Sequence, residues 1–125
     1  KNNNSQSSKN TEKVVKIGNV KFISKVFNDV DPKNLKGIVD KIIDNQSDCV
    51  VAVISIENNK ISLVVGVTNE LSSRINAIDL VKIGSSQFGG KGGGGRPTMA
   101  QSGGNDIKAS QKTIEALIKH IKDLG

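Results

Sequence analysis

Residues 89–104 read GGKGGGGRPTMAQSGG and hold eight of the 13 glycines in this 125-residue chain. Ordering a glycine costs roughly 0.5 to 1 kcal/mol more than ordering an alanine, so a fold does not favour such a run as a plain connection. Without Cβ atoms, backbone N–H groups are exposed and another molecule can come within van der Waals contact. Lys91 and Arg96 lie inside the run. The stretch therefore predicts a contact surface for an anionic molecule.

A flexible linker is the competing interpretation of this run, because glycine-rich segments commonly join domains. The central RPTMAQ sequence, residues 96–101, is not typical of linkers, and a strongly patterned helix follows Gly104. A linker joins two domains, whereas we expect this run to lie between two elements of one domain.

The composition of the chain predicts one domain with an aliphatic core and an acidic partner. A length of 125 residues is sufficient for a single buried core. Three Phe and no Trp or Tyr leave Ile, Val and Leu to form that core, and nearly exclude base stacking on aromatic rings. The formal net charge of +6 favours a polyanion, although lysines that only solvate the surface would give the same total.

Few side chains in this sequence are suited to catalysis or metal binding. Cys49, the one cysteine, lies in an apolar run and is interpreted as a small buried hydrophobe in a reducing compartment. His120, the one histidine, lies on the polar side of the last predicted helix and is interpreted as a surface residue. We therefore expect no catalytic residue, no metal site and no cofactor in this chain.

The pattern along the chain predicts an α/β fold near the α+β border, with a mixed, partly antiparallel sheet and about three covering helices. The expected order is β-α-β-β-α-(Gly loop, short β)-α. Residues 1–13 are polar and are expected to be a disordered linker or tail, and residues 14–125 a single domain. No apolar run of about 18 residues and no signal peptide occur, which predicts a soluble, cytoplasmic domain without a membrane partner.

Turn and cap residues place the individual elements. We expect a strand over 14–27, with Gly18-Asn19 able to turn a short preceding strand into it, and then a helix from Asp31-Pro32 to near Asn45. Strands over 49–56 and 61–67 follow, joined by a hairpin turn at 57–60. The last expected elements are a helix capped by Asn76 and stopped by Gly89, a short edge strand over 97–101, and a helix capped by Asn105 or Asp106.

Two nucleotide-binding motifs are excluded by context. Residues 90–95 formally satisfy G-x-G-x-x-G, but that motif must follow a strand and open a helix, whereas this one follows the end of a helix. A P-loop requires Ser or Thr after the lysine, and this chain has Gly92 after Lys91.

Folded RNA is the anion that suits the glycine run best. Lysine and arginine contact phosphate, bare backbone can lie against a base or ribose, and an amide or hydroxyl can reach a base edge or a 2′-OH. No capped helix presents an Arg, Asn or Gln face to a DNA major groove. The predicted RNA-binding residues are Lys91, Gly92, Gly93, Gly94, Gly95, Arg96, Gln101 and Ser102. A bulky side chain at Gly93 is expected to block RNA by sterics alone.

The glycine run, together with the preceding ISLVVGVTNEL of residues 61–71, resembles the C-terminal domain of alanyl-tRNA synthetases, also classed as the DHHA1 domain. The resemblance extends over about residues 14–125. It implies a module that docks on the outer corner of tRNA and helps to bring aminoacylation and editing domains together. The parent would be an ATP-dependent alanine-tRNA ligase that uses Mg and carries a structural zinc in its editing domain. Its expected partners are alanine-specific tRNA and the remaining synthetase domains, and homodimerisation is left open.

Two departures from the family pattern are visible. Four glycines follow Lys91 where the family usually has three, and Thr98 stands where an acidic residue is common. The extra glycine means that contacts are not assigned to individual glycines.

Two alternatives stay open at this point. A domain of the same superfamily forms the C-terminal part of DHH-type phosphoesterases. These enzymes act on oligonucleotides or cyclic dinucleotides and have a His after the glycine loop. This chain has Arg96-Pro97 there and no Asp-His-His segment. The other alternative is a structural or oligomerising module with an exposed apolar face. Salt-sensitive RNA binding would distinguish the tRNA-binding module from this alternative.

Overall fold

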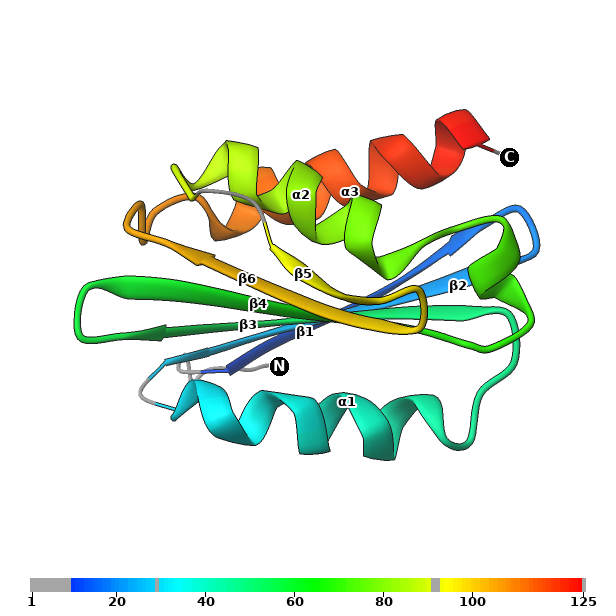
Figure 1. Cartoon of the computed structure of the whole chain (residues 1–125), viewed down its shortest axis with the longest axis horizontal. Coiled ribbons are helices and arrows are strands. Elements are labelled where there is room, and N and C mark those ends of the chain that lie inside the picture. Colours follow the sequence, from blue (N-terminus) through cyan, green and yellow to red (C-terminus); the bar gives the residue numbers. More distant parts are fainter. Residues whose placement is uncertain (1–9, 29, 91–92, 125) are drawn as a thin grey trace, which may run out of the picture.

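Six strands form one mixed sheet with helices on both faces (Figure 1). The computed structural model describes residues 10–28, 30–90 and 93–124. The elements are β1 Asn10–Ile17, β2 Val20–Asn28, η1 Pro32–Asn34, α1 Leu35–Ile43, β3 Cys49–Glu57, β4 Lys60–Val67, η2 Leu71–Ser73, α2 Ala77–Gln87, β5 Gly94–Arg96, β6 Met99–Gly104 and α3 Ser110–Leu124. The strand order is β1-β2-β3-β4-β6-β5, with β2 and β3 parallel and the other pairs antiparallel. The predicted α/β class with a mixed sheet is confirmed.

The first strand region is a hairpin. Ile17 pairs with Val20 across the Gly18-Asn19 turn, as the sequence allowed. β1 begins at Asn10, so residues 10–13, which their polarity assigned to a tail, pair with β2 instead. The physical reason is that an edge strand can be polar, because its ladder is made by backbone groups and not by side chains.

β3 is the central, fully covered strand that its continuous apolar sequence predicted. Its side chains alternate between two cores, with Val50, Ala52 and Ile54 on one face and Val51 and Val53 on the other. The hairpin to β4 is also confirmed, because its two turn asparagines adopt positive φ values of 54° and 61°.

α1 covers one face of the sheet and begins with the predicted cap. The Asp31 carboxylate accepts a hydrogen bond from the Lys33 backbone N–H at 3.0 Å, and Pro32 follows it. The first turn is a 3₁₀ turn, and the α-helix ends at Ile43, two residues before the expected end. The side chains on this face are Ile23, Leu35, Val39, Cys49, Val51, Val53 and Val64.

α2 and α3 cover the opposite face (Figure 1). Asn76 caps α2 as predicted, since its side-chain oxygen accepts a hydrogen bond from Ile78 N–H at 2.8 Å. Gly89 ends the helix with a φ of +73°, a conformation that glycine adopts without a Cβ penalty.

The predicted start of α3 is wrong. The helix begins at Ser110, not after Asn105 or Asp106. The backbone N–H groups of both residues donate to the Phe88 carbonyl at 3.3 and 3.2 Å, which holds them against the end of α2. The Asp106 carboxylate then accepts a hydrogen bond from Lys108 N–H, which closes a separate turn ahead of the helix.

The predicted short strand over 97–101 is present as β6, Met99–Gly104, but its predicted position at the edge of the sheet is wrong. β5, formed by three residues of the glycine run, is the edge, and β6 lies between it and β4. Pro97 and Thr98 form the turn, where the missing N–H of proline costs no ladder hydrogen bond. Their carbonyls accept hydrogen bonds from Ala77 N–H and Val67 N–H, both at 2.9 Å, so the turn is tied to the body of the domain.

Cys49 is fully buried at the start of β3, and this environment predicts a measurable pH effect. Desolvation by burial raises the pKa of the thiol from its ordinary value of 9.0 to about 11, against a smaller opposing effect of Lys21. The pKa of the thiol is higher in the folded chain than in the unfolded chain. The contribution of Cys49 to the free energy of unfolding is therefore complete below about pH 9 and declines as the pH rises toward 11. We expect the folded chain to resist the thiol reagent DTNB at pH 8 and the denatured chain to react fully; rapid labelling of the folded chain would contradict this burial.

Candidate nucleic-acid interface

β5 brings part of the glycine run to an exposed edge of the sheet (Figure 1). Gly94, Gly95 and Arg96 are all exposed. They pair antiparallel with β6, with Gly94 opposite Gln101 and Arg96 opposite Met99. Two predicted site residues, Lys91 and Gly92, lie outside the described residues. The run is thus not a linker, because it contributes a strand to the sheet of the same domain.

Most of the described glycines in the run serve the protein's own packing. A Cβ at Gly93 would lie closer than 3.0 Å to the Gln101 carbonyl oxygen, and one at Gly90 equally close to the Gly103 carbonyl. Gly95, with φ +150°, and Gly104 are blocked in the same way by the carbonyls of Met99 and Phe88. The expectation that Gly93 is bare for RNA is therefore corrected, because β6 already occupies the space in front of its Cα.

Gly94 is the exception within β5. A Cβ built there meets no atom within 4 Å, and its φ lies outside the positive range. The domain itself therefore does not need a glycine at this position. A glycine that the fold does not require, on an exposed edge, is available for close approach by another molecule.

Arg96 lies on the α1 face of the sheet edge. It is directly opposite Met99, which packs against the α1 core, so the two side chains share that face. Both line a hollow of about 480 Å³ that is also lined by the acidic residues Asp40, Asp44 and Glu70. Within residues 10–28, 30–90 and 93–124, Arg96 forms no ion pair. Its guanidinium is free for an anion, and the nearby carboxylates favour approach of that anion from the outer side of β5.

Gln101 and Ser102 point to opposite faces of β6, because consecutive strand residues alternate. Gln101 is exposed and lines a hollow of about 350 Å³ with Pro32 and Ser62 on the α1 side. The Ser102 hydroxyl donates to the Val81 carbonyl of α2 at 3.1 Å. The structure thus brings Gly94, Arg96 and Gln101 together along the edge and engages the Ser102 hydroxyl in holding α2 on the sheet.

Lys60 is a neighbouring cation that the sequence reasoning missed. Ile61 pairs with Gly104, and this register places Lys60 beside a hollow of about 380 Å³ lined by Gly89, Gly90 and Gly103. Lys60 and Gly104 are far apart in the sequence, so no local pattern could have joined them. The first residue of β4 therefore adds a positive charge at the Gly104 end of β6.

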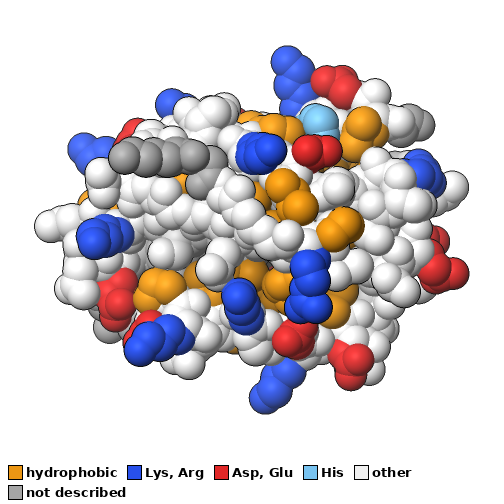
Figure 2. All heavy atoms as spheres, in the orientation of Figure 1, with side chains coloured by type: hydrophobic (Ala, Val, Ile, Leu, Met, Phe, Trp, Pro, Cys, Tyr) orange, Lys and Arg blue, Asp and Glu red, His pale blue; other side chains and the backbone are white. Residues whose placement is uncertain are grey.

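The charges near this edge are dispersed. Figure 2, in the orientation of Figure 1, shows Lys and Arg side chains spread over the face that presents β5, with Asp and Glu side chains between them. Among the residues that the structure describes, no group of three or more His, Cys, Asp or Glu side chains could hold a metal ion. In that part of the chain, no helix combines the length and apolarity needed to cross a bilayer. The geometry offers binding groups along a strand edge.

Comparisons with known proteins agree with this fold. A family model described as the DHHA1 domain matches residues 19–124. An alanine–tRNA ligase from Granulibacter bethesdensis is 44% identical over 106 residues, which are 85% of this chain but 12% of the ligase. The crystal structure of the C-Ala domain from Aquifex aeolicus alanyl-tRNA synthetase matches with a TM-score of 0.84 and 28% identity, over 88% of this chain and 98% of that one.

A pGpG-specific phosphodiesterase from Vibrio cholerae shares the fold at a lower level. It gives a TM-score of 0.53 and 17% identity, over 91% of this chain and 36% of the phosphodiesterase. At this identity the likeness is one of fold alone. With the family model covering nearly all of its described residues, the chain belongs to the DHHA1 domain family.

Proposed function

We propose that this chain is the tRNA-binding C-terminal domain of an alanine–tRNA ligase and that the β5 edge docks on the outer corner of tRNA. The observation that carries the proposal is the exposed Gly94 beside Arg96, which forms no ion pair with any residue that the structure describes, in a chain 44% identical to an alanine–tRNA ligase. Open backbone next to a free guanidinium suits a phosphate-rich, irregular surface.

In the proposed contact, the predicted site residues have two roles: some touch the tRNA, and Ser102 positions β6. Lys91 and Arg96 neutralise phosphates, Gly94 provides the close surface, and Gln101 reaches a base edge or a 2′-OH. Ser102 holds β6 against α2 through its hydrogen bond to Val81, and so positions the strand that carries Gln101.

The activity of the whole protein is a further part of the proposal, since the chain spans only 12% of the length of the curated ligase. The full protein would charge alanine-specific tRNA with ATP and Mg, and would edit mischarged tRNA with a zinc-containing domain. In that protein this chain binds tRNA and performs no chemistry. We place the full protein in the cytoplasm, where tRNA is charged.

Titration of the 125-residue chain with alanine tRNA at several salt concentrations tests the proposal. Two to four phosphate contacts give a slope of log K against log[salt] of roughly −1.5 to −4, because each contact releases counterions. A matched duplex DNA should bind more weakly, since the site does not suit a major groove. No complex at low salt, or a slope near zero, would contradict tRNA binding.

A further inference from the structure

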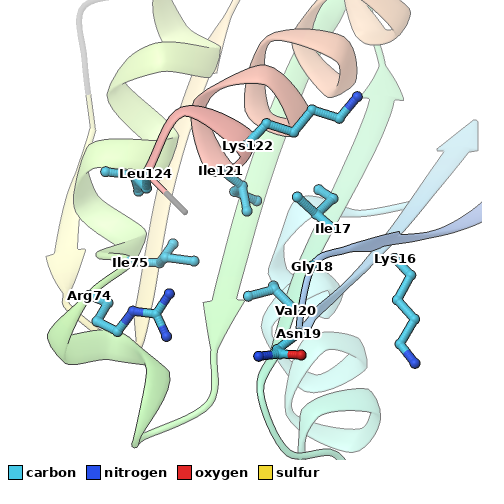
Figure 3. Close-up of a pocket in the computed structure, with 10 residues that line it drawn as sticks. All are labelled: Lys16, Ile17, Gly18, Asn19, Val20, Arg74, Ile75, Ile121, Lys122 and Leu124. Carbon is cyan, nitrogen blue, oxygen red and sulfur yellow. The ribbon is translucent and has the colours of Figure 1, made fainter.

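A second hollow lies away from the glycine run, where the β1–β2 turn, the segment after η2 and the C-terminal turn of α3 meet (Figure 3). Its volume is about 420 Å³. The lining residues are Lys16, Ile17, Gly18, Asn19, Val20, Arg74, Ile75, Ile121, Lys122 and Leu124. None of them belongs to β5 or β6, so this hollow is separate from the proposed tRNA contact.

The floor of the hollow is aliphatic. Figure 3 shows the side chains of Ile17, Val20, Ile75 and Ile121 converging on its centre. Leu124, on the rim, is 47% exposed and is one of two exposed large hydrophobic side chains among the described residues. A ligand that covers Leu124 and fills the floor removes apolar surface from water, which is favourable.

The rim of the hollow is positive. Lys16, Arg74 and Lys122 line it, and none of the described Asp or Glu residues does. Figure 3 shows the Arg74 side chain extending toward the hollow, whereas the ammonium groups of Lys16 and Lys122 point outward. In the part of the chain that the structure describes, these three cations form no ion pair. The guanidinium is therefore available for a planar, two-oxygen acceptor such as a carboxylate.

We propose that this hollow binds a protein segment in which an aliphatic side chain is flanked by carboxylates. The aliphatic side chain occupies the floor, and the carboxylates pair with Arg74 and with the rim lysines. Folded RNA fits less well, because the floor of the hollow is aliphatic. Charge complementarity and the exposed Leu124 together select an acidic, aliphatic peptide.

Binding of a designed peptide to the 125-residue chain tests the inference. The probe is a fluorescein-labelled peptide with two central leucines and three glutamates on each side, measured by anisotropy at low ionic strength. We expect it to bind at least about tenfold more tightly than two control peptides, one with lysines in place of the glutamates and one with serines in place of the leucines. Equal binding of the three peptides, or none, would overturn the proposal.

Variants assign the peptide to this hollow. Arg74→Gln and Leu124→Ser should each weaken binding of the probe by about fivefold to tenfold, and neither should lower the melting temperature, because both side chains are exposed. Arg96→Gln removes the same charge at the β5 edge and should leave peptide binding unchanged. Arg74→Gln should in turn leave tRNA binding unchanged, so this proposal and the proposed function can fail separately.

Two other outcomes would reassign the hollow and overturn the peptide proposal. If Arg74→Gln weakens tRNA binding and peptide binding is absent, the occupant is RNA. If the chain sediments as a dimer that Leu124→Ser dissociates, the occupant is a second copy.

Discussion

Replacement of Gly94 by Val is expected to weaken tRNA binding by at least about tenfold, or about 1.4 kcal/mol, while the melting temperature of the domain stays unchanged. The domain tolerates the side chain because a Cβ at Gly94 meets nothing within 4 Å, and valine suits a strand. The partner does not tolerate it, because two methyl groups hold an RNA backbone or base away from β5. Filter binding of alanine tRNA and thermal unfolding by circular dichroism measure the two effects.

Gly93→Val is the matched control, one residue away. Its Cβ would collide with the Gln101 carbonyl of β6, and such overpacking costs about 1 to 3 kcal/mol of folding stability. We therefore expect this variant to melt at a lower temperature, in contrast to Gly94→Val. Wild-type tRNA affinity in Gly94→Val would show that the open glycine is not a point of contact.

Those features of the fold that depend on neighbouring residues could be predicted from the sequence. Asp31-Pro32 and Asn76 cap their helices through hydrogen bonds to N–H groups two residues ahead. Asn58 and Asn59 take the positive φ values that a tight hairpin needs. In each case the side chain or backbone preference acts within a few residues, so the local pattern contains the information.

Features that depend on distant backbone could not be predicted in this way. The start of α3 is displaced because the Phe88 carbonyl accepts two hydrogen bonds from residues that look like helix caps. The glycine run becomes a strand because β6 is there to pair with it. No local pattern specifies either contact, so the sequence placed the edge strand at 97–101 and missed β5.

In the candidate site, too, some features could be predicted from the sequence and others depend on distant backbone. The sequence identified Arg96 and Gln101, and the structure places both on one face of the β5–β6 edge. The sequence alone could not distinguish Gly94, which the fold leaves open, from Gly93 and Gly95, which face carbonyls of β6. It also missed Lys60, which only the register of β4 against β6 brings near Gly104.

The double variant Lys91→Ala/Arg96→Ala is expected to show the largest loss of tRNA affinity. Each charge-assisted contact to phosphate is worth about 1 to 3 kcal/mol, so the pair should cost about 2 to 4 kcal/mol if the two effects partly add. The loss corresponds to roughly 30-fold to 1000-fold in dissociation constant. Arg96 is exposed and forms no ion pair within the described residues, so its removal should not destabilise the domain.

A control for net charge is Lys36→Ala/Lys41→Ala on α1. Both lysines are exposed on the solvent side of that helix, so the variant loses the same two charges from another surface. If tRNA were attracted by net charge alone, both double variants would lose affinity equally.

The dissociation constant for alanine tRNA, measured side by side for the wild-type chain and these two double variants at one low salt concentration, tests the tRNA-docking role of the β5 edge most directly. We expect a loss of roughly 30-fold or more for Lys91→Ala/Arg96→Ala and less than about threefold for Lys36→Ala/Lys41→Ala. Equal affinities for the two double variants would contradict the docking of tRNA on β5.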